Sequence, residues 1–340
     1  MRSVIGLLTP ARVAGAVAGL AVLTGLVLYL LPSNDYLLLP DNAHPVAPLV
    51  DVKGGHDPTG PGAIYFVDVI ERRASLLESM FPGLRSGSTL VPAHLIVPPG
   101  VSDSAQRQAD LREMSISQRV AAAVALRRLG YKVVAKPSGV VIDALDDQSD
   151  AVGKLRPEDV IVAIDDRPTP TIAALRARLA RLRPGDSASV TVERGSEKTT
   201  YEVKTMADPA ERSRAIIGFA PGQAADIKLP IPVKIDAGNV GGPSAGLAFA
   251  LEVLEELGHN VDHGYKVAAT GQIELNGEVT PIGGVKQKTF GVRQTGADVF
   301  LVPAGDNAQV ARRYANGLRI IPVKSFPQAL HALATLPPKQ

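Results

Sequence analysis

The stretch that decides the fold lies at residues 241–288, which begin GGPSAGLAFALEVLEEL and end ATGQIELNGEVTPIGGVKQK. The GGPSAG segment predicts a tight turn that delivers Ser244 to an apolar helix over residues 245–257. Unpaired backbone N–H groups and the helix dipole favour negative charge at such a helix start. A developing oxyanion is therefore expected at this turn. The turn residues expected around it are Gly242, Pro243 and Ala245.

The end of the same stretch predicts a helix that carries two lysines. At about 100° per residue, Lys288 lies on the same face as Val285 and Val292. Lys286 lies instead beside Arg293. We therefore expect Lys288 to be the buried lysine of the pair.

A buried lysine has a lowered pKa, because desolvation disfavours its charged form. A neutral amine can accept the proton of a serine hydroxyl, so Ser244 and Lys288 are candidates for a Ser-Lys catalytic dyad. Spacing alone leaves a second interpretation open, in which Ser244 caps the helix and Lys288 extends its amine into water.

The GPSAG and PIGGVKQK segments resemble the proteolytic domain of Lon proteases, and the likeness covers roughly residues 231–336. The resemblance implies an α+β fold and a serine-type endopeptidase. It implies that Ser244 is the nucleophile, that Lys288 is its base, and that Thr270 supports the lysine amine.

Two positions depart from the pattern of Lon. Gly241 stands where an acidic residue commonly precedes GPSAG, and Gln272 stands where Lon has the glutamate of its TGE segment. The dyad is retained, but control of the site by those carboxylates is not implied for this chain.

Composition excludes several functional classes. The chain has 340 residues, 45% of them hydrophobic, which is enough for two or three packed domains. Its formal net charge of +2 argues against a nucleic-acid-binding surface, and the lack of cysteine excludes disulfides and thiolate metal sites. No GxxxxGK[ST] segment is present, so we expect neither ATP nor another cofactor. His259 and His263 are interpreted as solvated loop residues, without a metal.

The N-terminal region predicts a membrane anchor. Residues 13–31 carry no charge, and at about 1.5 Å per residue they nearly span a bilayer core of about 30 Å. Arg2 and Arg12 precede this segment and aspartates follow it, so the positive-inside rule places residues 1–12 in the cytoplasm and the rest of the chain outside. A cleavable signal peptide is the alternative.

Residues 32–131 are expected to contain a linker and the N-terminal part of the protease region. Residues 32–62 are rich in Pro, Asp and Gly, which favours a linker. Residues 63–99 are expected to join the catalytic sheet as an early hairpin. An alanine-rich helix is predicted over residues 117–129 and is ended by Gly130.

Residues 132–204 form a predicted inserted domain. They contain the LRPEDVIVAI segment, a helix at residues 171–182 and a strand pair that turns at Gly195. The order of elements and the LxPxDxI pattern resemble a PDZ domain, although two glycines of the usual GLxxGDxI are missing. The resemblance implies that a peptide C-terminus adds to the sheet edge. The backbone groups expected to hold its carboxylate belong to Pro137, Ser138, Gly139 and Val140. A structural domain without a ligand remains the alternative.

Two other functions compete with a protease. The GPSAG segment also fits the GxSxG pattern of α/β-hydrolase esterases, with Asp306 and His331 or Asp262 and His263 as acid and histidine. That interpretation leaves PIGGVKQK unexplained. A membrane-tethered PDZ adaptor with an inactive protease fold is the second alternative.

The sequence thus favours a single-pass membrane-anchored, ATP-independent serine endopeptidase with its catalytic domain at residues 205–340, outside the cytoplasm. Without a motor, its partners are expected to be flexible or unfolded protein segments. The oligomeric state is left open, with a homo-oligomer as one option.

Overall fold

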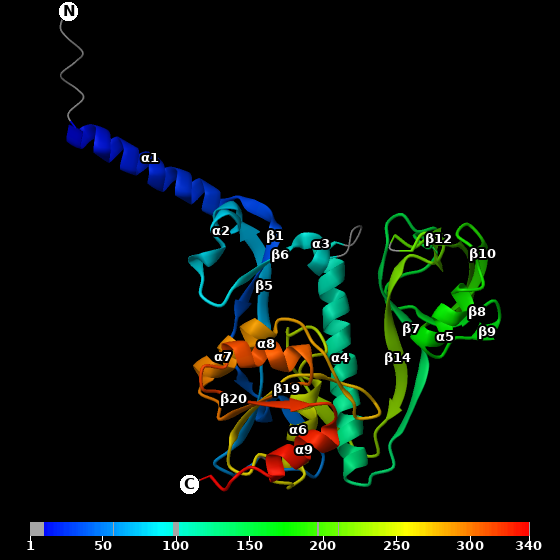
Figure 1. The fold of residues 1–340 in the computed structure, drawn as a ribbon. Helices are drawn as coiled ribbons and strands as arrows, with labels where there is room; N and C mark the ends of the chain where they lie inside the picture. Colours follow the sequence, from blue (N-terminus) through cyan, green and yellow to red (C-terminus); the bar gives the residue numbers. More distant parts are fainter. Residues whose placement is uncertain (1–9, 57, 98–101, 196, 210, 340) are drawn as a thin grey trace, which may run out of the picture.

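The computed structural model describes residues 10–56, 58–97, 102–195, 197–209 and 211–339, with the side chain of Arg12 left out. Helix α1 (Pro10–Leu30) projects away from the rest of the chain (Figure 1). Among the described residues, its segment Val13–Leu30 is long and apolar enough to cross a membrane, and none of it is buried. The sidedness expected from residues 1–12 rests largely on positions outside the described residues.

The linker predicted for residues 32–62 is wrong over residues 32–52, most of which fold into strands. Strand β1 (Pro32–Pro40) lies between β5 and β6, and Leu37 within it is 2% exposed. Burial of three consecutive leucines thus stabilises a strand here, although Pro and Asp residues surround them. The other strands and short helices of this N-terminal part are β2 (His44–Pro45), η2 (Ala47–Leu49), β3 (Val50–Val52), β5 (Val69–Ser75), α2 (Leu76–Met80), η3 (Pro82–Leu84), β6 (Thr89–Pro92) and α3 (Ala93–Ile96).

The first lobe is built on a mixed sheet with the strand order β2-β4-β16-β19-β20. The last four of these strands are parallel, and β2 is antiparallel at the edge. Strand β4 joins this sheet from the early part of the chain, beside β16. The strands are β4 (Ala63–Phe66), β16 (Lys266–Ala269), β19 (Val299–Pro303) and β20 (Arg319–Val323), and the helices are α6 (Gly246–Glu256), α7 (Val285–Thr295), α8 (Asp306–Tyr314) and α9 (Phe326–Ala334).

Helix α6 is the centre of this lobe, since every residue from Gly246 to Glu256 is buried. Its Phe249 packs in one core cluster with Phe66 of β4 and Phe326 of α9. Two short strand pairs complete the lobe, namely β15 (Val233–Ile235) with β3, and β17 (Gln272–Ile273) with β18 (Val279–Thr280).

Helix α4 (Asp103–Arg128) is longer than the predicted helix at residues 117–129. Ser102 caps its start by accepting a hydrogen bond from the backbone N–H of Ala105. Residues 120–126 of the helix are all buried, because α4 stands between the first lobe and strands β7 and β14 (Figure 1). Its first half is polar, so the pattern of hydrophobic residues did not predict a helix there.

The second lobe has its own core and a sheet with the order β11-β10-β8-β7-β14. Val140, Ile161 and Leu175 pack in that core. An ion pair of 2.6 Å between the Nε of Arg194 and the buried carboxylate of Asp159 ties β10 to the turn before β8. The elements are β7 (Val134–Leu145), β8 (Val160–Ile164), β9 (Arg167–Pro168), α5 (Ile172–Leu179), β10 (Ser187–Arg194), β11 (Glu197–Lys204), β12 (Met206–Ala207), β13 (Ala215–Ile216) and β14 (Phe219–Lys228).

Candidate active site

Ser244 sits on a turn that helix α4 holds in place. Gly242 adopts a φ of +79°, which favours glycine, and its N–H donates to the backbone oxygen of Asp110 at 2.7 Å. The hydroxyl of Ser117 donates to the carbonyl of Pro243 at 2.9 Å. Helix α6 begins at Gly246, two residues after the serine. These two hydrogen bonds from α4, which is distant in the sequence, thus hold the turn that the local sequence forms.

Lys288 lies on the buried face of α7, as the helix geometry predicts. Its side chain is buried, with the residue 4% exposed, and Nζ lies 2.6 Å from the Oγ of Ser244. The same Nζ lies 3.3 Å from the Oγ1 of Thr270. Two hydroxyls from separate parts of the chain, those of Ser244 and Thr270, therefore contact one lysine amine.

Thr270 holds both partners of the pair. It follows strand β16, and its hydroxyl donates to the backbone oxygen of Ser244 at 3.2 Å. The N–H of Gly271 donates to that same oxygen at 2.8 Å. The loop after β16 consequently fixes the serine backbone and contacts the lysine at once.

Burial lowers the pKa of Lys288 to about 8, against an opposing effect of Asp68 and then Glu71, whose negative charges raise it. At pH 7 roughly a tenth of the amine is therefore neutral. A lysine in this state can accept a proton from a hydroxyl at 2.6 Å.

The other lysine of α7 points elsewhere. Lys286 donates from Nζ to the backbone oxygen of Ser88 at 2.7 Å, and the amine lies 5.7 Å from the centre of the Tyr314 ring. Lys286 therefore links the start of β6 to α7. Among the contacts of the described residues, none joins Lys286 to Ser244.

Two of the three turn residues expected around the oxyanion have no free N–H to donate. The N–H of Gly242 is already bonded to Asp110, and Pro243 has no N–H to donate. The Ala245 N–H has no acceptor among the described residues, and it lies at the N-cap of α6. The geometry thus leaves Ala245 as the available donor of the three.

The residues expected to hold a peptide carboxylate, Pro137 to Val140, all lie in β7. Strand β14 pairs with β7 along its whole length, with Ala224 opposite Gly139. The side chain of Gln223 adds bonds of 2.9 Å to the carbonyls of Gly139 and Pro170. A strand of the chain itself therefore occupies the edge of β7 to which a peptide was expected to add.

The acids and histidines of the esterase alternative do not reach the serine. Asp306 is in α8 and His331 is in α9, while Asp262 accepts a hydrogen bond from the Gly264 backbone. Within the described part of the chain, the hydrogen-bond partner of the Ser244 hydroxyl is a lysine and not a histidine.

One cluster near the site was missed by sequence reasoning. Asp41, His44 and Asp68 bring potential metal-ligand atoms within 4.8 Å of one another. These residues come from the region interpreted as a linker and from the loop after β4, so no local spacing marks them.

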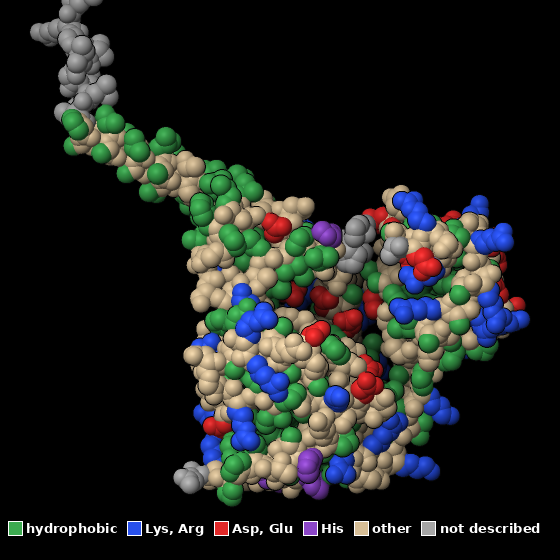
Figure 2. Space-filling view, in the orientation of Figure 1, with side chains coloured by type: hydrophobic (Ala, Val, Ile, Leu, Met, Phe, Trp, Pro, Cys, Tyr) green, Lys and Arg blue, Asp and Glu red, His purple; other side chains and the backbone are tan. Residues whose placement is uncertain are grey.

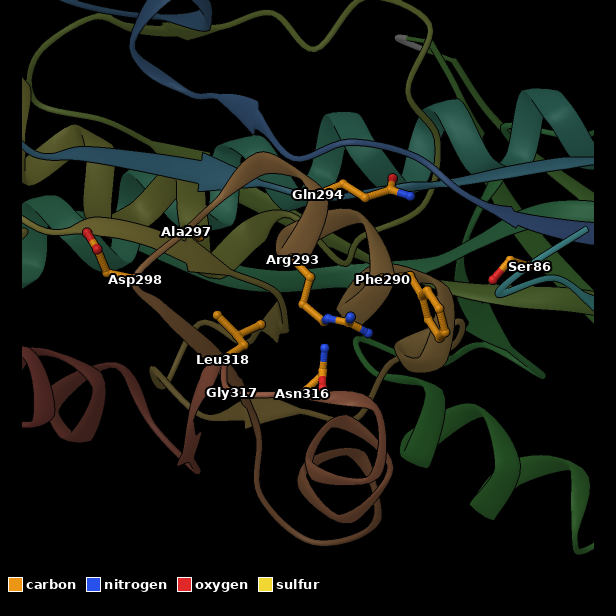
Figure 3. A pocket seen from close by; sticks show the side chains of 9 residues that line it. All are labelled: Ser86, Phe290, Arg293, Gln294, Ala297, Asp298, Asn316, Gly317 and Leu318. Atoms are coloured by element: carbon orange, nitrogen blue, oxygen red, sulfur yellow. The ribbon is translucent and has the colours of Figure 1, made fainter.

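A cavity of about 590 Å³ lies on the outer face of α7 (Figure 3). Phe290, Arg293 and Gln294 line it from the helix. These positions are 140° to 240° around the helix from Lys288, so the cavity is on the opposite side from the dyad. A second, smaller cavity of about 120 Å³ is lined by Pro243, the neighbour of Ser244.

Comparisons with known proteins agree with this arrangement. Residues 217–335 match the profile of the Lon protease (S16) C-terminal proteolytic domain, and residues 127–205 match that of the PDZ domain. The first match includes Ser244, Thr270 and Lys288. The chain therefore combines a Lon-type proteolytic domain with a PDZ domain.

Individual relatives share part of this combination. Lon protease 2 of Bacillus subtilis is 33% identical over 150 residues, which cover 43% of this chain and 26% of that protein. Lon protease of Rhizobium meliloti is 36% identical over 131 residues, covering 37% and 16%. This chain thus spans about a quarter or less of the length of these relatives. The solved PDZ domain of the SdrC-like protein of Listeria monocytogenes is 20% identical, with a TM-score of 0.23, and covers 25% of this chain and 87% of its own.

Proposed function

We propose that this chain is an ATP-independent serine endopeptidase in which Ser244 is the nucleophile and Lys288 is the general base. The observation that carries the proposal is the 2.6 Å contact between the Ser244 hydroxyl and the buried amine of Lys288. The pKa of that amine, lowered by burial to about 8, supports its role as a base near neutral pH.

The reaction follows from these positions. Neutral Lys288 takes the proton of Ser244 as the hydroxyl oxygen attacks the substrate carbonyl, and the resulting ammonium then gives the proton to the leaving amine. The N–H of Ala245 donates to the developing oxyanion at the start of α6. Water, deprotonated by Lys288, hydrolyses the acyl-enzyme, and the proton returns to Ser244. Thr270 keeps the amine directed at Ser244 throughout.

The substrates proposed are flexible or unfolded polypeptide segments. The sequence has no phosphate-binding GxxxxGK[ST] loop to supply the work of unfolding. Helix α1 is proposed as a single membrane anchor, with the lobes on the extracytoplasmic side. The uncharged segment Val13–Leu30 and the arginines that precede it in the sequence support this arrangement.

The PDZ domain is proposed to select substrates by a tail. Capture of a carboxylate by the Pro137–Val140 backbone requires β14 to leave the edge of β7, because that edge is paired. Tail binding in this chain is therefore coupled to the release of a strand that leads directly toward Ser244 in the sequence.

Variants of the two α7 lysines test the proposal. Lys288→Arg should abolish cleavage of an unstructured peptide, since a guanidinium remains protonated and cannot act as a base. Lys286→Ala is the matched control and should retain cleavage, because its amine contacts Ser88 and not the serine. Retained cleavage in both Ser244→Ala and Lys288→Arg would refute the dyad and favour another catalytic site.

A further inference from the structure

The cavity of about 120 Å³ beside the nucleophile lies between the two lobes. It is smaller than pockets for drug-sized ligands, which have volumes of about 300 to 1,000 Å³, and suits one long side chain. The hollow between the lobes gathers acidic side chains (Figure 2). The polar residues that line the cavity include Glu113, Ser117, Asp143, Gln272 and Glu274.

Asp143 of strand β7 is the most deeply buried acid of this cavity, with 8% of its side chain exposed. Its Oδ1 accepts no hydrogen bond within the described part of the chain. Arg112 is nearby, but its Nε remains 3.9 Å from this oxygen and its other nitrogens bond the Asp143 carbonyl and Glu158. A buried carboxylate oxygen without a donor is costly, so Oδ1 is an unsatisfied acceptor in a side chain that lines the cavity.

Glu113 adds a second carboxylate from helix α4. It precedes Ser117, which holds the Pro243 carbonyl, by one helical turn. No described residue donates a hydrogen bond to the Glu113 carboxylate, and burial together with the charge of Asp143 raises its pKa to about 7. Burial likewise raises the pKa of Asp143 to about 6. The charge of Arg112 lowers both pKa values, but the effect of burial is larger.

The position of the cavity relates it to the chemistry. Pro243 lines it, and the next residue along the chain is Ser244. Gln272 and Ile273, which follow the Thr270 loop, line it from the other side. A substrate whose carbonyl reaches Ser244 therefore has its neighbouring side chains within reach of this cavity.

We propose that the cavity binds the side chain of a lysine or arginine adjacent to the cleaved bond, through Asp143 and Glu113. This inference rests on the proposed endopeptidase function and specifies its substrate class. The five donors of a guanidinium would bond the carboxylates of Asp143 and Glu113 together. Substrates are then flexible segments with a basic residue at the cleavage site.

The test compares two peptides that differ in one residue, arginine or its neutral isostere citrulline, placed in turn at the two positions on either side of the cleaved bond. The full-length chain should show a kcat/KM ratio of about tenfold or more in favour of arginine at one position, since a hydrogen bond to a charged group has about that effect. Asp143→Asn and Glu113→Gln should each reduce this ratio by about fivefold or more. Asp147→Asn removes an exposed acid of the same lobe and should leave the ratio unchanged.

The ratio separates this inference from the function on which it rests. Equal cleavage of the arginine and citrulline peptides, or a ratio that survives both variants, would overturn the inference and leave the dyad intact. Binding of the same peptides to Ser244→Ala measures the preference without catalysis, and equal affinity there would also overturn it. If the wild-type chain cuts no peptide while Ser244→Ala still prefers arginine, the proposed reaction fails and the basic-side-chain site stands.

Discussion

Replacing Lys288 with methionine should abolish cleavage and yet stabilise the folded chain at neutral pH. Methionine has a similar length and no charge, so it fills the same buried space on α7. The wild-type amine is costly to bury, because folding lowers its pKa from 10.5 to about 8. A catalytic base kept in a buried site is expected to lower stability in this manner.

The magnitude follows from the pKa. Each pKa unit corresponds to about 1.4 kcal/mol, so at pH 7 the buried amine costs about 3 kcal/mol relative to a neutral side chain. Methionine loses the contacts with the hydroxyls of Ser244 and Thr270, which contribute about 1 kcal/mol each at most. The Lys288→Met variant should therefore have a free energy of unfolding about 1 to 2 kcal/mol above that of the wild type at pH 7.

The dependence on pH has a definite sign. A lysine whose folded pKa is lowered costs the most below pH 8, and the wild type regains stability as the pH rises from 8 toward 10.5. At pH 10 the remaining cost is below about 1 kcal/mol. The advantage of Lys288→Met should consequently vanish or reverse there.

Urea unfolding followed by circular dichroism at pH 7 and pH 10 measures both values. Lys286→Met is the matched control, because it changes a lysine of the same helix that is only partly buried and donates to Ser88. It should not stabilise the chain at either pH. A Lys288→Met chain that is less stable than the wild type at pH 7, with no change by pH 10, would refute the view of Lys288 as a desolvated base.

Three further changes test the surroundings of the dyad. Thr270→Val removes the hydroxyl 3.3 Å from the lysine amine and should lower kcat/KM about fivefold with little loss of stability. Peptide cleavage and thermal unfolding measure the two effects, and an unchanged kcat/KM would exclude a supporting role. Gly241→Asp restores the acid common in Lon, but a Cβ there would lie 2.7 Å from the Cβ of Asp110. The free energy of unfolding in urea should therefore fall by about 1 to 3 kcal/mol, and full stability would contradict the close contact. Gln223→Ala removes side-chain hydrogen bonds that hold β14, and it should increase the affinity for a peptide with a free C-terminus relative to the amidated peptide. Fluorescence anisotropy measures both affinities, and equal binding of the two peptides would exclude carboxylate capture.

The sequence predicted those features that depend on local periodicity or on a dense motif. The burial of Lys288 follows from the spacing of apolar residues along α7, and the start of α6 near Ser244 follows from the glycines and proline of the turn. The helices and strands after Ser244 alternate regularly, so their order was readable.

The remaining features depend on contacts between distant parts of the chain. No local sequence pattern indicates that β14 pairs with β7. The sequence therefore did not predict that β14 occupies the edge of β7. Asp110 takes the N–H of Gly242 only because the polar half of α4 is helical. The carboxylates of Glu113 and Asp143 meet across two lobes, which a linear sequence does not place together.

The most direct test of the dyad is the rate at which a small acylating ester modifies Ser244 between pH 5 and pH 10, located by peptide mass spectrometry. With Lys288 as the base, the rate should rise about tenfold per pH unit at low pH and level off near pH 8, where the amine becomes neutral. In Lys288→Ala this rise should disappear and the acylation should be slow throughout. A rate in the wild type that does not depend on pH, or acylation at a residue other than Ser244, would contradict the account.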